Sequence, residues 1–150
     1  MGQLSRNSTF IMLSVALVIL LIVVACGGSA GDSNTQDLER PAPPADYAGK
    51  TNPLANDATA VEAGKQLYAT NCVSCHGAKA MGDGPASNSL NPKPKPLAME
   101  MKSLKDDYLF WRISEGGAFP PFTSAMPAWK AILSEDEIWK VITYLRTFEK

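Results

Sequence analysis

The last part of the chain carries the clearest pattern of apolar and polar positions. Four apolar residues recur at i, i+3, i+4 and i+7, the spacing of one helix face: Ile138, Val141, Ile142 and Leu145. Just before them, Ser134 and Glu137 have the spacing of a capping box, in which each side chain bonds the backbone N–H of the other residue. The pattern predicts an amphipathic helix that begins after Ser134.

A second amphipathic helix is predicted over Asp57–Asn71. Thr59 and Glu62 have capping-box spacing at its start, and an apolar face follows them. Gly64 lies inside this helix, where glycine costs about 1 kcal/mol relative to alanine. A close helix crossing that leaves no room for a side chain would explain the glycine.

A middle helix is predicted from Lys105 to Glu115, with Ser103 near its cap and Gly116 ending it. Loops rich in glycine and proline separate the three helices, and no segment alternates as a strand would. We therefore expect one all-α domain over residues 58–150, with three to five helices. A domain of about 90 residues has a thin core, which a large buried cofactor would fill.

The first residues have the pattern of an export signal. Residues 10–25 are apolar except for Ser14, a run shorter than the roughly 20 residues that cross a bilayer as a helix. Small residues then precede Cys26, which resembles a bacterial lipobox. We expect a signal peptide over residues 1–25, a lipidated Cys26 and an extracytoplasmic domain anchored to the membrane. An uncleaved signal anchor is the alternative.

Residues 26–57 are rich in glycine, serine and proline and show almost no apolar periodicity. They are predicted to form a flexible tether between the lipidated cysteine and the helical domain. Such a tether either lets the domain move between partners or lies along one fixed partner, and the sequence leaves both open.

The strongest chemical signal is the run Cys72–His76, which reads Cys-x-x-Cys-His. One helical turn would place both thiols and the imidazole on one side, where the thiols can bond haem vinyl groups and His76 can reach the iron. A redox Cys-x-x-Cys pair would need a βαβ context, and a structural zinc site would need a fourth ligand. One covalent haem c is the prediction.

A second iron ligand must come from another residue type, because the chain has one histidine. Met126 is the main candidate: it lies fifty residues after His76 in a loop that Pro127 stiffens. Met99 and Met101 are the weaker candidates, with core packing as their alternative role. Arg112 is a candidate partner for a haem propionate, and a solvated surface position is its alternative.

With these motifs, residues 58–150 resemble a small class I cytochrome c. The resemblance implies crossed N- and C-terminal helices, with Gly64 and Tyr68 at the crossing against residues of the last helix. It also implies a proline whose carbonyl accepts a bond from the ligating imidazole, and Pro85 is the first candidate.

Four features together resemble the monohaem cytochrome subunit of alternative complex III: the lipobox, the proline-rich tether, the Gly-Asp-Gly-Pro run after the haem motif and the Met-Pro-Ala-Trp run. This resemblance implies electron transfer from a quinol-oxidising complex to a terminal oxidase or soluble redox carrier. A haem enzyme or small-gas sensor with an open iron position is the alternative. The net charge of −1 and the absence of a basic stripe argue against a nucleic-acid partner.

Overall fold

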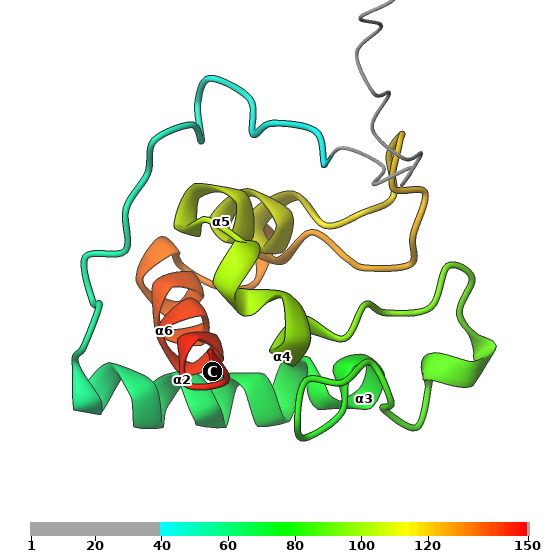
Figure 1. The fold of residues 1–150 in the computed structure, drawn as a ribbon, viewed down its shortest axis with the longest axis horizontal. Coiled ribbons are helices and arrows are strands. Elements are labelled where there is room, and N and C mark those ends of the chain that lie inside the picture. Colours follow the sequence, from blue (N-terminus) through cyan, green and yellow to red (C-terminus); the bar gives the residue numbers. More distant parts are fainter. Residues whose placement is uncertain (1–39, 150) are drawn as a thin grey trace, which may run out of the picture. The chain divides into compact units, whose positions relative to one another are not determined.

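The computed structural model of this protein describes residues 40–149, and the unit Pro41–Lys150 is helical (Figure 1). Its α-helices are α2 (Ala58–Asn71), α3 (Val73–His76), α4 (Leu97–Glu100), α5 (Asp106–Glu115) and α6 (Glu135–Arg146). Three 3-10 turns complete it: η1 (Ser87–Ser89), η2 (Met101–Ser103) and η3 (Trp129–Ala131). No strand occurs among residues 40–149, so the all-α prediction is confirmed. The predicted signal peptide and Cys26 lie outside the described residues.

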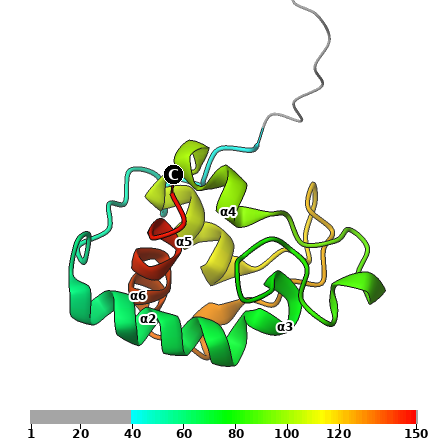
Figure 2. The same cartoon turned by 60° about the horizontal axis from the view of Figure 1, so that its bottom comes forward.

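Helices α2 and α6 cross in close contact (Figures 1 and 2). At the crossing, a Cβ atom on Gly64 would overlap the carbonyl oxygen of Lys140 and lie 3.1 Å from Cβ of Tyr144. One helical turn further along α2, the ring of Tyr68 lies 5.4 Å from the ring of Tyr144, centroid to centroid. The expected crossing at Gly64 is therefore confirmed, and it fixes where the C-terminal end of α2 points.

The two crossing helices begin in different ways. Ser134 and Glu137 form the predicted capping box at the start of α6. Helix α2 instead starts from Asp57, whose carboxylate accepts bonds from the backbone N–H groups of Thr59 and Ala60. The prediction of a Thr59–Glu62 capping box is wrong, because Asp57 is a stronger acceptor and also takes the Thr59 hydroxyl at 2.7 Å.

Helix α5 packs its apolar side into the core beside α6. Phe110 and Trp139 stack with ring centroids 4.3 Å apart. Lys105 occupies the N-cap position without a side-chain cap bond, Ser103 lies two residues before it, and Gly116 ends the helix as predicted with φ of 70°. A positive φ of this size suits glycine, because a side chain would crowd the backbone.

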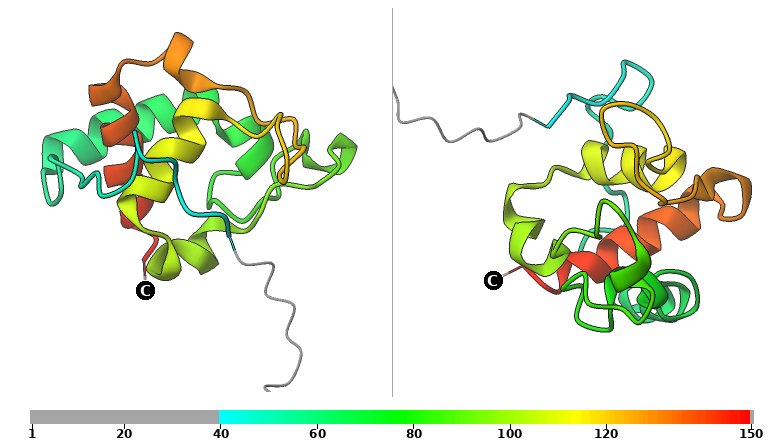
Figure 3. Two further views of the ribbon diagram at one scale, coloured as in Figure 1. Left: turned by 90° about the horizontal axis from the view of Figure 1, so that it is seen from above. Right: turned by 90° about the vertical axis from the view of Figure 1, so that its right-hand side faces the viewer.

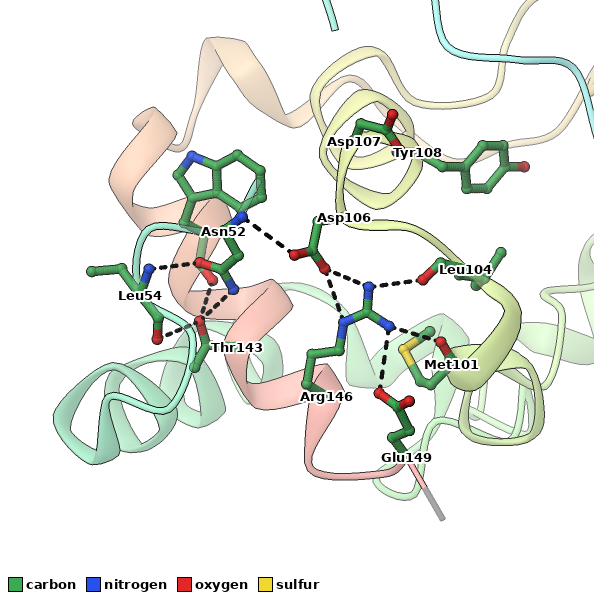
Figure 4. A network of polar contacts seen from close by, with 11 residues as sticks. Asn52, Leu54, Met101, Leu104, Asp106, Asp107, Tyr108, Thr143, Arg146 and Glu149 are labelled. Carbon is green, nitrogen blue, oxygen red and sulfur yellow. Dashed lines mark hydrogen bonds and ion pairs between the residues drawn. The ribbon is translucent and has the colours of Figure 1, made fainter. Parts of the chain in front are cut away.

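Residues 41–57, here called the strap, lie along α5 and α6. The side-chain amide of buried Asn52 donates to the Thr143 hydroxyl at 2.9 Å, and its backbone N–H donates to the Asp106 carboxylate at 3.2 Å (Figure 4). The structure thus differs from the sequence-based expectation, which assigns the strap to the flexible tether. The strap has almost no apolar periodicity, and polar side chains on the two helices satisfy its hydrogen-bonding groups.

Arg146 joins the end of α6 to the chain that leads into α5 (Figure 4). Its guanidinium bonds the Asp106 carboxylate, the carbonyl of Met101 at 2.8 Å and the carbonyl of Leu104 at 2.7 Å. These bonds satisfy the carbonyl groups of two residues at the start and at the C-terminal cap of η2. In the part of the chain that the structure describes, no helix is long and apolar enough to cross a membrane.

Gly64→Ala tests the crossing through the sign of its effect. Helix propensity alone would stabilise the variant by about 1 kcal/mol. The new Cβ must push α6 away from α2, so we expect a loss of about 2 kcal/mol or more in the free energy of unfolding. Chemical denaturation of the haem-loaded protein measures it, and a stabilised variant would show that the helices do not touch at Gly64.

Candidate haem-attachment site

The two cysteines and the histidine lie on one turn of helix. Cys72 ends α2 and caps α3, and the N–H of His76 donates to the carbonyl of Cys72 at 2.9 Å. Cys72 and Cys75 form no disulfide. This is the arrangement that the Cys-x-x-Cys-His run predicts, with both thiols and the imidazole within five residues at the C-terminal end of α2.

The loop after His76 folds back on α3 and holds its backbone. The N–H of Gly82 donates to the carbonyl of His76 at 2.9 Å, and the N–H of Ala86 donates to that of Ser74 at 2.9 Å. Between them, a Cβ on Gly84 would lie 2.5 Å from the carbonyl oxygens of Val73 and Ser74. Only glycine permits this approach, so the Gly-Asp-Gly-Pro run serves to bring the loop onto the cysteine turn.

Tyr68 fixes the other end of the same turn. Its hydroxyl is buried and donates to the carbonyl of Gly77 at 2.8 Å, next to His76. Sequence analysis finds Tyr68 as a crossing residue but misses this bond. The sequence signal for this bond is that residue 68 is a tyrosine and not a phenylalanine, because a buried hydroxyl needs a hydrogen-bond partner.

His76 has an unused hydrogen-bonding group. Its Nδ1 atom is buried and has no hydrogen-bond partner among the described residues, and burial lowers the pKa of the imidazole, which favours its neutral, ligating form. Pro85 lies in the loop that packs on α3, yet the structure contains no bond between its carbonyl and Nδ1. The proposed role of Pro85 stays a prediction.

Arg112 is the second buried group without a full set of partners. Its guanidinium lies 3.3 Å from the ring centroid of Phe122 and 5.6 Å from those of Trp111 and Phe119. Its Nη1 atom is buried with no hydrogen-bond partner, and burial lowers the pKa of the group. A buried cation of this kind calls for an anion, and the described part of the chain supplies none to Nη1.

Among the described residues, the buried side-chain polar atoms without a partner belong to His76, Arg112 and Ser114. Of these, Nη1 of Arg112 is the atom for which the sequence predicts a haem partner, a propionate, whereas the resemblance pairs Nδ1 of His76 with a proline carbonyl. Native proteins leave few such atoms unpaired, and an absent group is a usual reason. The residues present therefore fit haem c.

Met126 lies in the loop between α5 and η3, here called the methionine loop (residues 117–127). The N–H of Gly117 donates to the carbonyl of Met126 at 2.9 Å, and a Cβ on Gly116 would lie 2.5 Å from that same oxygen. The side chain of Met126 is half-buried against the core. The base of this loop is thus closed by backbone contacts, and the loop reaches the same end of the domain as the loop after α3 (Figures 1 and 3).

The other candidate methionines have different surroundings. Met101 is fully buried in the core, where it packs as an apolar side chain. Met99 is 73% exposed. These exposures favour Met126 as the second ligand, although its role stays a prediction.

The rival chemistries of the cysteine pair have little support. Burial, and then the neighbouring Cys75, raise the pKa of the Cys72 thiol to about 12. A thiol that stays protonated at neutral pH is a poor redox nucleophile. No group of three or more His, Cys, Asp or Glu residues that could bind a metal ion occurs in residues 40–149.

Comparison with known proteins gives a family match. The model of the family "Cytochrome C oxidase, cbb3-type, subunit III" matches residues 59–145. A curated relative, the cytochrome c subunit of the quinone alcohol dehydrogenase of Gluconobacter oxydans, is 34% identical over 105 residues, which cover 65% of this chain. The match covers 20% of that relative, so the chain corresponds to a fraction of it.

Two solved structures have a similar fold. Cytochrome CL from the methylotroph Methylophaga aminisulfidivorans is 27% identical with a TM-score of 0.50, covering 65% of this chain and 60% of that one. A chain of the reducing HAO-like complex of Kuenenia stuttgartiensis has a TM-score of 0.53 at 24% identity, covering 65% of this chain and 47% of that one. The latter likeness concerns the fold alone.

The family match extends from the first turn of α2 to the last turn of α6, and so covers both crossing helices. It includes the whole cysteine–histidine turn and the methionine loop. Sequence motif, helical fold and family match agree: the chain belongs to the cytochrome c family, as a class I c-type cytochrome.

Proposed function

We propose that this chain is a membrane-anchored electron carrier that holds one haem c through Cys72, Cys75 and His76, with Met126 as the second iron ligand. The observation that carries the proposal is the single helical turn that brings Cys72, Cys75 and His76 together, supported by the buried, unpartnered Nη1 atom of Arg112. Electron transfer is the function of the cytochrome c family to which the chain belongs.

The chain's own residues divide the work of holding such a cofactor. Cys72 and Cys75 would attach it by thioether bonds, and the bonds from the following loop keep their turn in place. Arg112 would pair with a propionate inside its cage of aromatic rings. When bound, haem c supplies a one-electron iron couple, whose potential a methionine ligand raises.

The proposed partners are a quinol-oxidising complex as the electron donor and a terminal oxidase or soluble carrier as the acceptor. The curated relative, a cytochrome c subunit of a quinone alcohol dehydrogenase, supports a partner that handles quinones. The resemblance to the monohaem subunit of alternative complex III supports the same direction of flow. Lipidation at Cys26 would keep the domain at the extracytoplasmic membrane surface.

Replacing Met126 tests whether the chain is an electron carrier or a haem enzyme with an open coordination position on the iron. The unmutated reduced protein should bind carbon monoxide slowly, because the thioether occupies the iron. Met126→Ala should bind it rapidly and gain some peroxidase activity, whereas Met126→His should keep the haem and have a lower potential, since imidazole stabilises ferrous iron less. Stopped-flow absorbance measures the rate of carbon monoxide binding, and redox titration measures the potential.

The matched control is Met99→Ala, because this exposed methionine should leave the visible spectrum and the carbon monoxide rate unchanged. If the unmutated protein binds carbon monoxide as fast as Met126→Ala does, Met126 is not a ligand of the iron. The enzyme or sensor function would then replace the carrier function.

Arg112→Gln tests the pairing with a propionate. The positive charge should hold the propionate pKa low, and its removal should raise that pKa toward neutrality. Oxidation favours the ionised propionate, so the potential of the variant should fall as pH rises through this pKa, while the unmutated protein stays flat near neutral pH. Arg112→Lys should retain most of the flat profile, and identical profiles for all three proteins would exclude the pairing.

Cys26→Ser tests the anchor. Loss of the acylated sulfur should release the domain into the soluble fraction, because the acyl chains would be its attachment to the membrane. Fractionation of cells that express the full chain measures the release. A variant that stays bound after a high-salt wash would show that the anchor is an uncleaved helix or a subunit contact.

A further inference from the structure

Glu115 is the last residue of α5, and one of its carboxylate oxygens joins three separate segments. Oε1 accepts a bond from the hydroxyl of Tyr47, which belongs to the strap. The same oxygen accepts a bond of 2.7 Å from Nζ of Lys130, which belongs to η3. The strap, the end of α5 and the segment after the methionine loop therefore meet at one atom.

This atom lies at the base of the methionine loop. Glu115 comes just before Gly116 and Gly117, which contact the carbonyl of Met126 from one end of the loop. Lys130 comes four residues after Met126, at the other end. The Glu115–Lys130 ion pair thus joins the two ends of the loop through side chains, in addition to the backbone bond between Gly117 and Met126.

The strap side of the contact is fixed independently. The ring of Tyr47 lies 6.2 Å from that of Phe110, centroid to centroid, and the N–H of Gly49 donates to the Asp107 carboxylate at 3.0 Å. A position held in this way gives Glu115 a stationary donor. The bond from Tyr47 to Glu115 therefore belongs to a set of contacts that hold the strap on α5.

The charges suit a lasting contact. The bonds from Lys130 and then Tyr47 lower the pKa of Glu115, so the carboxylate is ionised at neutral pH. Burial, and then the bond to Glu115, raise the pKa of Tyr47 to about 12, so its hydroxyl remains a donor. Two donors and one anionic acceptor form charge-assisted bonds, which are stronger than neutral ones.

We propose that Glu115 is a positioning residue, which couples the strap to the methionine loop and thereby slows the opening that separates Met126 from the iron. The inference rests on the proposed role of Met126 as a ligand. It assigns the strap a part in the redox site, although the strap contributes no iron ligand.

The test measures how fast added imidazole binds to the oxidised, haem-loaded full chain, because binding requires Met126 to leave. Tyr47→Phe, Glu115→Gln and Lys130→Met should each raise this rate about fivefold, the scale of losing about 1 kcal/mol of contact energy. The double variant Tyr47→Phe/Lys130→Met should raise it by less than the product of the single changes, since both donors share one acceptor and loss of either already weakens the contact.

The matched control is Lys140→Met, which breaks the surface pair of Lys140 with Asp136 on α6, away from the loop. Its imidazole rate should equal that of the unmutated protein at similar thermal stability. The coupling is overturned if the Tyr47, Glu115 and Lys130 variants keep the unmutated rate, or if Lys140→Met raises it equally. Tyr47→Phe removes one hydroxyl only, so this variant keeps the test valid if another fails to fold.

Failure of the underlying ligand assignment would give a different result. Met126→Ala then would bind imidazole no faster than the unmutated protein, whatever the Glu115 variants do. A fast Met126→Ala together with unchanged Glu115 variants would retain the ligand and reject the coupling.

Discussion

The backbone of α2 touches the backbone of α6 at Gly64, and the position of the cysteine turn follows from this contact. Since α3 begins where α2 ends, the crossing directs Cys72, Cys75 and His76 toward one end of the domain. Bonds from the loop after His76 and from the hydroxyl of Tyr68 then hold the turn from both sides. A side chain at position 64 would displace the whole arrangement.

The two halves of the candidate site are built differently. The cysteine turn continues a long helix, whereas Met126 lies in a loop whose ends are held by contacts of Gly116 and Gly117. A helix keeps its ligands in place by its own hydrogen bonds, while a loop depends on what fastens its base. This difference is the reason that Glu115 and the strap are proposed to steady the loop that carries Met126.

Local signals predicted α6, its capping box and the cysteine turn, because their partners lie within a few residues. The place of the strap could not be predicted, since Asn52 finds Thr143 and Asp106 at sequence separations of 91 and 54 residues. The predicted cap of α2 was wrong for a local reason, because Asp57 begins the helix two residues before Thr59 and its carboxylate takes the N–H groups of Thr59 and Ala60. The crossing at Gly64 was predictable because a glycine within a helix is destabilising unless a close contact leaves no room for a side chain.

The central claim is that Cys72 and Cys75 hold one haem through covalent bonds. The most direct test is the intact mass of the haem domain, taken from cells that export and mature c-type cytochromes and measured after denaturation in acid. The account predicts the mass of the polypeptide plus one haem, with neither Cys72 nor Cys75 open to alkylation. A polypeptide without added mass and with both thiols alkylated would contradict it.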